Sequence, residues 1–189
     1  MIITISGNPG SGKSTVAKIL VRQLGYERIY AGGILRDMAK EKGITIETLM
    51  QNAETNPQID EEVDARVAAE ARKYEGEGKN VLVEGRVQYH FLPESKKVYV
   101  FVDPRTGAER IWKDLQDKEA SAARNQQQAN SFDEVLRLTE EREARDAQRY
   151  LKLYGTDHRN QDNYDFVVDT TNITAQEAAD KVMEYIQKE

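Results

Sequence analysis

The sequence predicts an α/β protein, a three-layer sandwich built around a mostly parallel sheet of five strands. Short apolar runs alternate with longer segments whose apolar residues recur at helical spacing. The runs 81–83 and 98–102 are continuously apolar, which is typical of parallel strands covered on both faces. Strands that alternate with helices in this way place helices on both faces of one sheet.

The expected strands, in chain order, are 2–6, 27–30, 81–83, 98–102 and 166–168. The expected helices are 13–24, 31–42, 46–53, 60–74, 106–118, 132–154 and 175–187. Gly43 separates the second helix from the third, and Gly76 follows the fourth, as glycines commonly do at helix ends. No internal repeat interrupts this order, so we expect a single domain over 1–189.

The composition excludes several classes of protein. The chain has a net charge of −6, which does not favour a dedicated nucleic-acid binder. It contains no cysteine, and His90 and His158 are too isolated for a metal cluster, so we expect each to be a surface or packing residue. No run approaches the roughly 18 apolar residues of a membrane span. We expect a cytoplasmic monomer that binds small nucleotides, with neither nucleic acid nor membrane as a partner.

Residues 7–14 read G-N-P-G-S-G-K-S and match the phosphate-loop pattern G-x-x-x-x-G-K-[ST] without a mismatch. Glycines let successive backbone N–H groups point at a phosphate, and the following helix adds the positive end of its dipole. A glycine-rich turn without a ligand is the plain alternative, which the position between a strand and a helix disfavours. The expected ATP-binding residues are Gly7, Asn8, Pro9, Gly10, Ser11, Gly12, Lys13, Ser14 and Thr15.

Within this loop the chemistry needs particular side chains. We expect Lys13 to bridge the β- and γ-phosphates and the Ser14 hydroxyl to bind Mg²⁺. Glu84, at the end of the third strand, would hold a water bound to the metal. The expected cofactors are therefore ATP and Mg²⁺. The chain lacks the N-K-x-D motif of GTPases, and its third strand ends in V-E-G-R rather than in the D-E of mechanical ATPases.

Transfer between two phosphorylated molecules needs arginines beyond the phosphate loop. Arg86 follows the carboxyl end of a strand, where ligands of open α/β sheets bind. Arg36 follows a small-residue turn, and a solvent-facing helix charge is its alternative. Arg110 lies in the helix after the fourth strand, where the alternative is a surface pair with Asp114 at i+4.

The helix 132–154 carries charges on one face, because Arg142, Asp146 and Arg149 recur at i, i+4 and i+7. The ordinary explanation is a solvated face with i,i+4 pairs. However, the only apolar residues of the helix between 140 and 149 are alanines. Apolar anchors flank this charged middle instead: Phe132, Val135, Leu136, Tyr150, Leu151 and Tyr154. This pattern predicts a helix that crosses a polar site.

Two further segments have expected roles. The stretch 119–131 is rich in alanine, glutamine and asparagine and has no apolar stripe, so we expect a small helical lid there. The helices within 31–75 are the expected acceptor-binding region.

Together these segments resemble the cytidylate kinases, within the nucleoside monophosphate kinase group of P-loop kinases. The resemblance runs nearly end to end, over 7–14, 31–36, 83–86, 91–93, 103–110, 142–149 and 164–171. The R-x-x-R-D-x-x-R run at 142–149 is its most specific element. The short chain and the residues 149–157 are similar to the compact archaeal-type members, which lack the extra nucleotide-binding insert of the common bacterial form.

The resemblance implies that five residues bind the acceptor: Arg36, Arg86, Arg142, Asp146 and Arg149. It implies that three residues act in the transfer itself: Lys13, Arg110 and Arg142. Arg36 and Arg86 would hold the acceptor phosphate, and the 142–149 face would reach its phosphate, ribose and cytosine side. The implied function is Mg-ATP-dependent phosphoryl transfer to CMP or dCMP.

The chain also departs from the pattern. Val87 stands where aspartate often follows glycine-arginine, and Ala31 stands where a hydroxyl residue often opens the acceptor turn. Two alternatives therefore stay open: a P-loop kinase for another small acceptor such as AMP, UMP or a non-nucleotide metabolite, and an ATP-dependent regulatory module without kinase activity.

Overall fold

The structure is a computed structural model of the whole chain, and it describes residues 1–116 and 129–188. The strands of its sheet are β1 (Ile2–Gly7), β2 (Glu27–Tyr30), β3 (Val81–Glu84), β4 (Lys96–Phe101) and β5 (Phe166–Asp169). Their order is β2-β3-β1-β4-β5, and every neighbouring pair is parallel. The predicted α/β class and its five-stranded parallel sheet are confirmed.

The helical elements are α1 (Lys13–Leu24), α2 (Ala31–Glu41), α3 (Ile46–Thr55), α4 (Pro57–Gly76), α5 (Gln88–Phe91), α6 (Pro104–Gln116), α8 (Phe132–Tyr154), the 3-10 turn η1 (Gln161–Asn163) and α9 (Ala175–Gln187). Helices α1, α8 and α9 have the predicted bounds. Helix α4 begins before residue 60, because Asn56 caps it through the Gln58 N–H and Pro57 occupies its first position. The four-residue helix α5 was not predicted.

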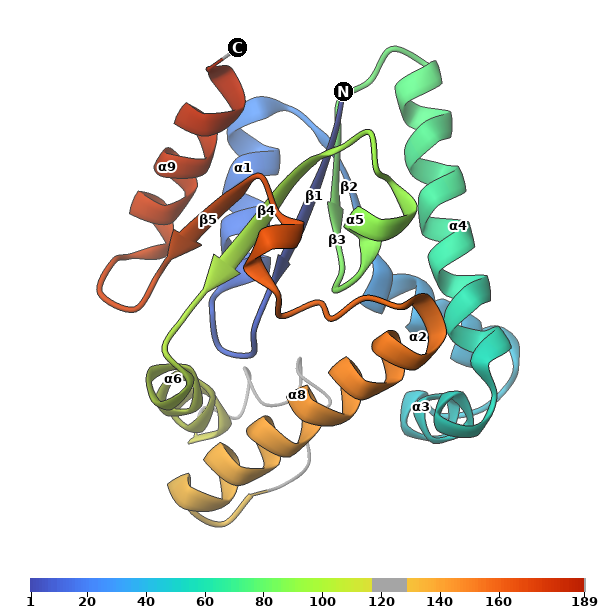
Figure 1. Cartoon of the computed structure of the whole chain (residues 1–189), viewed down its shortest axis with the longest axis vertical. Helices are drawn as coiled ribbons and strands as arrows, with labels where there is room; N and C mark the ends of the chain where they lie inside the picture. The colour runs from blue at the N-terminus through green and yellow to red at the C-terminus, as the bar shows by residue number, and fades with distance from the viewer. Residues whose placement is uncertain (117–128, 189) are drawn as a thin grey trace.

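Helices cover both faces of the sheet (Figure 1). Alternate residues of β1 point to opposite faces. Ile3 and Ile5 pack with α1 and α9 in one apolar core, and Ile2 packs with α2, α3 and α4 in the other. All three isoleucines are buried. The two cores fix the sheet between its helical layers and leave the carboxyl ends of the strands for other contacts.

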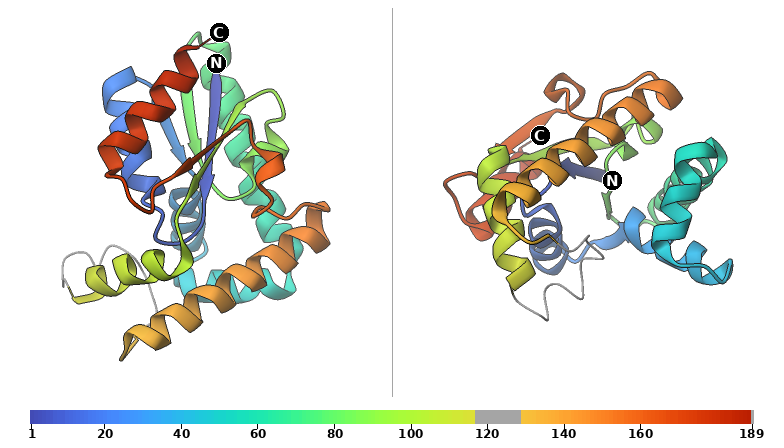
Figure 2. Two further views of the ribbon diagram at one scale, coloured as in Figure 1. Left: turned by 60° about the vertical axis from the view of Figure 1, so that its left-hand side comes forward. Right: turned by 90° about the horizontal axis from the view of Figure 1, so that it is seen from below.

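Helix α8 runs beneath these carboxyl ends, across the direction of the strands (Figure 2). Its N-terminal half packs on α6 in a separate apolar cluster that includes Ile111 and Val135. At its other end, the ring of Tyr154 packs edge-on against Phe91 of α5, with centroids 4.9 Å apart, and its hydroxyl donates to Asp64 of α4. Helix α8 is thus anchored at both ends, as predicted, and its charged middle spans the edge of the sheet where the phosphate loop lies.

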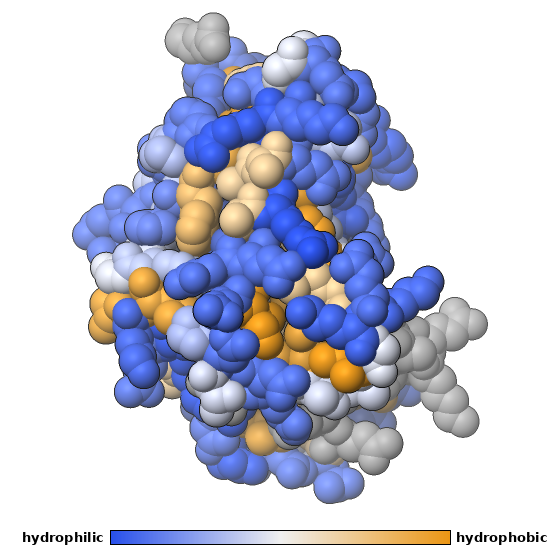
Figure 3. All heavy atoms as spheres, turned by 90° about the vertical axis from the view of Figure 1, so that its right-hand side faces the viewer, coloured by the Kyte–Doolittle hydropathy of each residue, from blue (hydrophilic) through white to orange (hydrophobic). Residues whose placement is uncertain are grey.

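The predicted lid, 119–131, lies mostly outside the described residues. The predicted acceptor region, 31–75, consists of α2, α3 and most of α4, and its role stays a prediction. On the side of the molecule that carries α4, polar and charged residues cover most of the surface, and apolar ones appear in patches between them (Figure 3). In the described part of the chain, no helix has both the length and the apolar character that crossing a membrane requires.

Candidate active site

The phosphate loop connects β1 to α1 and depends on its glycines. Gly10 and Gly12 have φ angles of 77° and 80°, in the left-handed region that residues with a side chain rarely adopt. At Gly7, a Cβ atom would lie 2.2 Å from the carbonyl oxygen of Val100. The backbone shape of the loop therefore requires glycine at all three positions.

Hydrogen bonds tie the loop to the two neighbouring strand ends. The Asn8 side chain donates to the Val102 carbonyl at 2.7 Å and accepts from the Val102 N–H at 3.0 Å. The Thr170 hydroxyl, just after β5, donates to the Ser11 carbonyl at 3.0 Å. Because these bonds fix Asn8 and Ser11 of the loop, the N–H groups of the loop are already arranged before any anion binds.

Arg110 of α6 lies against the same loop. Its guanidinium donates to the Gly10 carbonyl at 3.3 Å and to the Thr170 carbonyl at 2.6 Å. Arg110 thus joins the phosphate loop to the end of β5 in this structure. Its part in the transfer itself stays a prediction.

Glu84, at the end of β3, is completely buried, with 0 % of its side chain exposed. In the sheet it is aligned with Ile5 of β1 and Tyr30 of β2. One of its carboxylate oxygens accepts a hydrogen bond from the Ser14 hydroxyl, and the other pairs with Arg28. Sequence reasoning did not identify Arg28, because its position in an edge strand gave no sign of a partner 56 residues away.

Lys13 lies next to this carboxylate, with its Nζ 3.9 Å from Glu84 Oε1. Burial lowers the pKa of Lys13, Glu84 opposes that shift, and the positive charge of Arg86 adds to it. Lys13 therefore lies close enough to Arg86 for the two charges to repel each other. A phosphate group between them would relieve that repulsion.

The residues around Ser14 suit a magnesium ion. Across 1–116 and 129–188, no three His, Cys, Asp or Glu side chains are grouped as a metal site. Mg²⁺ does not need such a group, since it usually takes one or two carboxylates, substrate phosphates and several waters. The hydroxyl of Ser14 and the nearer carboxylate oxygen of Glu84 are hard oxygen ligands at the foot of the phosphate loop.

A cavity of about 260 Å³ opens beside the phosphate loop. Its lining consists of Ser11, Gly12, Thr15, Arg110, Thr170, Ile173, Thr174 and Ala175. Residues 173–175 enter it from the start of α9, which the sequence did not mark as part of a site. The mixed lining, with one guanidinium among small residues, suits a planar polar group such as a nucleobase.

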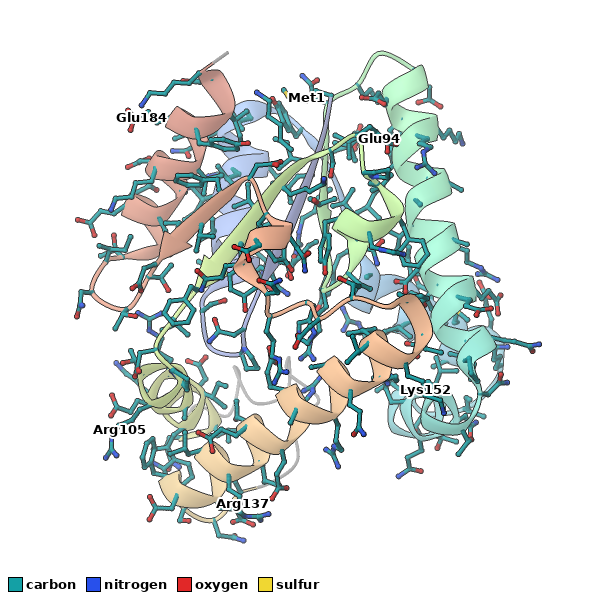
Figure 4. All side chains as sticks on the ribbon, in the orientation of Figure 1. Met1, Glu94, Arg105, Arg137, Lys152 and Glu184 are labelled. Carbon is teal, nitrogen blue, oxygen red and sulfur yellow. The ribbon has the colours of Figure 1, made fainter. Side chains whose placement is uncertain are left out.

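The charged face of α8 meets Arg86 at the carboxyl end of β3. The Arg86 guanidinium is paired with Asp146, and Arg149 lies 3.2 Å from the other carboxylate oxygen of Asp146. Arg142 is 3.8 Å from Asp146 and half exposed, with 50 % of its side chain accessible. Four of the five predicted acceptor residues thus lie together. Figure 4 shows side chains filling the space between α8 and the strand ends, while the labelled Arg137 lies on the outer side of α8.

Two buried aspartates of α4 extend this network, and sequence reasoning missed both. Asp60 lies 3.4 Å from Arg149. Asp64 accepts hydrogen bonds from Gln88 at 2.6 Å and from the Tyr154 hydroxyl at 2.9 Å. Burial raises the pKa of Asp64 to about 6 despite these two hydrogen bonds. The i,i+4 spacing of two aspartates among apolar residues was the available signal.

His158 is completely buried, which agrees with the packing alternative of the prediction, but it also has a charged partner that was not predicted. Its Nε2 lies 3.0 Å from a carboxylate oxygen of Glu143. The other oxygen of Glu143 lies 3.8 Å from Arg86. Residue 158 stands in the irregular segment after α8, where spacing gives no clue to its partner.

Arg36, the fifth predicted acceptor residue, lies apart from these four. Its guanidinium sits 5.1 Å from the centre of the Tyr30 ring, at the end of β2, and its side chain is exposed. Arg28 lies at the same distance from the same ring. The structure therefore places Arg36 at the β2 edge of the site, near the carboxylate that holds Arg28, and not on the α8 face.

Comparison with known proteins agrees with this geometry. A family model described as "AAA domain" matches residues 3–137. A curated cytidylate kinase of Archaeoglobus fulgidus is 37% identical, covering 99% of this chain and 95% of that protein. One of Pyrococcus abyssi is 34% identical over 90% of this chain and 85% of that protein. Among solved structures, a shikimate kinase of Bacteroides thetaiotaomicron aligns with a TM-score of 0.63 at 16% identity, covering 99% of this chain and 98% of that one.

The last likeness shows the fold alone, because the identity is low. The parallel sheet, the complete phosphate loop and the group of arginines formed by Arg86 and α8 are features of a P-loop kinase. Sequence identity over almost the full length then narrows the class: the chain belongs to the cytidylate kinase family.

Proposed function

We propose that this protein transfers the γ-phosphoryl group of Mg·ATP to a nucleoside monophosphate, with CMP or dCMP as the acceptor. One observation supports the proposal: two groups of cationic side chains lie at the carboxyl edge of the sheet, and each could bind a phosphate. Lys13 and the phosphate loop form one, and Arg86 with the α8 arginines forms the other. A single ATP would occupy only the first group, so the second is available to bind another phosphorylated molecule.

The donor would lie with its phosphates on the loop and its base in the cavity beside Arg110. Mg²⁺, held through Ser14 and Glu84, would neutralise charge on the donor phosphates. The chain's own residues then supply position and electrostatics. Lys13 stabilises the negative charge that develops on the transferring group, without forming a covalent intermediate.

The acceptor would lie between Arg86 and α8. An oxygen of its phosphate attacks the γ-phosphorus, a new phosphorus–oxygen bond forms, and the bond to the β-phosphate oxygen breaks to release ADP. Arg86 and Arg142 hold the attacking phosphate in line with the donor. Asp146 orients Arg86 and Arg149 and offers a carboxylate oxygen to the hydroxyl groups of the sugar.

The acceptor's base is the finer part of the proposal. The relatives named above are cytidylate kinases, which supports CMP or dCMP. Val87 directly follows Arg86, and Ala31 opens the helix that carries Arg36. Because both depart from the related pattern, AMP, UMP or another small acceptor is the rival.

A coupled assay for ADP release tests both levels. ADP formation is measured with Mg·ATP alone and with CMP, dCMP, UMP or AMP added, and Lys13→Ala serves as the control for contaminating kinases. We expect CMP and dCMP to stimulate turnover most. Stronger stimulation by AMP or UMP would replace the base assignment, whereas slow turnover that no acceptor stimulates would indicate a regulatory module.

A further inference from the structure

We propose that His158 is a positioning residue for the acceptor phosphate: it fixes Glu143, and Glu143 in turn orients the guanidinium of Arg86. The inference rests on the proposed function, in which Arg86 holds a phosphorylated acceptor. It adds a residue from the segment after α8, which has no part in the P-loop motif and carries no charge pattern of its own.

The burial of His158 is the first step of the argument. None of its surface is exposed. The ring of Tyr150 meets it edge-on, with centroids 5.4 Å apart. A polar ring is costly to bury unless a hydrogen bond compensates, and here the compensating partner is Glu143, at 3.0 Å. The two side chains therefore hold each other in one orientation.

The direction of that hydrogen bond follows from Glu143. Although burial acts in the opposite direction, the hydrogen bond with His158 and the charge of Arg86 lower the pKa of Glu143. An ionised carboxylate can only accept, so His158 Nε2 donates. The bond to His158 engages Oε1 and leaves Oε2 with no hydrogen-bond partner, 3.8 Å from Arg86. Glu143 thus presents a buried negative charge to one side of the Arg86 guanidinium.

Arg86 is held from its backbone as well. Its carbonyl accepts a hydrogen bond from Ser6 at 2.9 Å, and the Tyr164 hydroxyl lies 3.5 Å from it. That same hydroxyl donates to the His158 carbonyl at 2.7 Å. The segment 158–164 therefore lies against the Arg86 backbone through Tyr164, and it acts on the Arg86 guanidinium only indirectly, through Glu143.

The consequence concerns the order of a long side chain. Asp146 attracts the Arg86 guanidinium from α8, and Glu143 attracts it from a neighbouring position on the same helix. Two carboxylates together fix the orientation of the Arg86 guanidinium, whereas a single carboxylate would leave the guanidinium free to rotate about the contact. An arginine already ordered in the free protein loses less conformational freedom when a phosphate binds. His158 would act on affinity for the acceptor and not on the donor.

The first measurement uses the ligand-free protein and follows the Arg86 Nε–H group by ¹⁵N relaxation. We compare wild type with His158→Phe, which keeps a ring but removes the donor, and His158→Gln, which restores an N–H at a similar position. His90→Phe is the matched control, because His90 is exposed and, among the aromatic rings of the described residues, it contacts Phe91 and Tyr154 and not His158 or Tyr150. We expect Arg86 to become mobile in His158→Phe alone.

The second measurement is binding of CMP and of ATP to the same proteins by calorimetry. For His158→Phe we expect CMP affinity to fall by about 3- to 10-fold, somewhat less than one full hydrogen bond to a charged group, with ATP affinity unchanged. His158→Gln should recover most of the loss. If His158→Phe does not fold, Glu143→Gln is decisive, because it keeps the shape and removes the charge that faces Arg86.

The outcomes separate cleanly. The inference is overturned if a folded His158→Phe or Glu143→Gln variant keeps the Arg86 side chain as well ordered as it is in the wild type. Equal losses of CMP and ATP affinity also overturn it, since they indicate general loosening. If wild type binds no monophosphate, the proposed function fails, but the Arg86 relaxation in the free protein still decides the role of His158.

Discussion

In the proposed function, the donor and acceptor sides of the site would hold phosphate with different kinds of chemical group. The donor side is one continuous loop, 7–15, whose backbone N–H groups are aimed by glycine geometry and by bonds from Asn8 and Thr170. The acceptor side is assembled from side chains of α4, the β3–α5 turn, α8 and the segment after it. The two sides lie within electrostatic reach of each other, as the pKa of Lys13 shows.

This difference in construction has energetic consequences. Backbone groups are not changed by substitution, so we expect the donor loop to tolerate changes of side chain except at its glycines and at Asn8, Lys13 and Ser14. The acceptor side depends on pairing between buried or half-buried charges, and removing one partner leaves another unbalanced. We therefore expect donor binding to be robust and local, and acceptor binding to be sensitive to distant single charges and to pH.

The largest expected effect tests Lys13, the donor-side residue whose charge would stabilise the transferring group. Lys13→Ala should reduce turnover by a factor on the order of 10² or more, because it removes the positive charge that would stabilise the transferring phosphoryl group. Lys18→Ala, an exposed lysine on the same helix, is the matched control and should leave turnover unchanged. Circular dichroism checks that both variants fold. Near-normal ADP formation by folded Lys13→Ala would remove the donor assignment.

The second effect tests the acceptor side through Asp146. Asp146→Asn leaves Arg86 and Arg149 poorly matched, at a cost of about 1–3 kcal/mol. Catalytic efficiency toward the acceptor should fall about 5- to 150-fold, with the KM for ATP unchanged. Steady-state kinetics with each substrate varied measures the split. Glu140→Gln, an exposed carboxylate of the same helix, should change neither value, and full efficiency in Asp146→Asn would return this face to a solvated set of charges.

The third effect concerns how firmly the donor loop is held. Thr170→Val keeps the shape of the side chain but removes the hydroxyl that donates to Ser11, and a buried carbonyl loses its donor. We expect the free energy of unfolding to fall by about 1–3 kcal/mol and the KM for ATP to rise by about 2- to 10-fold. Urea denaturation and kinetics provide the two values. A rise in the acceptor KM of the same size would contradict the separation of the two sides.

The smallest effect is one of stability and concerns Asp64. Its pKa is about 6 in the folded protein against about 3.9 unfolded, so the folded state retains a proton that the unfolded chain releases. This contribution to stability is fully present below pH 4 and is lost as the pH rises through 6. Asp64→Asn does not titrate, so its stability relative to wild type should improve by about 1–3 kcal/mol between pH 4 and 7. Urea denaturation across that range measures it, and a constant difference would contradict the raised pKa.

The sequence predicted the donor side more completely than the acceptor side, because the donor side is one contiguous loop and the acceptor side is assembled from separate segments. The donor loop was predicted residue by residue because its pattern is contiguous and each position has one geometric purpose. On the acceptor side, helical spacing identified Asp146 and Arg149, and the strand end identified Arg86. Asp60, Asp64 and His158 were missed there, as was Arg28 beside Glu84, because each has a partner that only the folded chain brings near.

The fold itself was predicted more completely than the site. Continuous apolar runs identified the strands, and helical periodicity identified α1, α8 and α9 with their bounds. The start of α4 was placed too late because the Asn56-Pro57 pair was not used as a helix start, although its chemistry predicts one. The helix α5 is a single turn, too short to show a period.

The phosphate loop depends on a residue far outside its eight-residue motif, Gly107 of α6. The first turn of α6 packs so tightly on the phosphate loop that a Cβ atom on Gly107 would lie 2.6 Å from the Pro9 carbonyl, and one on Gly10 would lie 2.3 Å from the Gly107 carbonyl. A chain with the same eight letters but a larger residue at position 107 could not close the loop in this form. A search that requires glycine at positions 10 and 107 together should therefore separate phosphate loops of this form from chance matches to the motif.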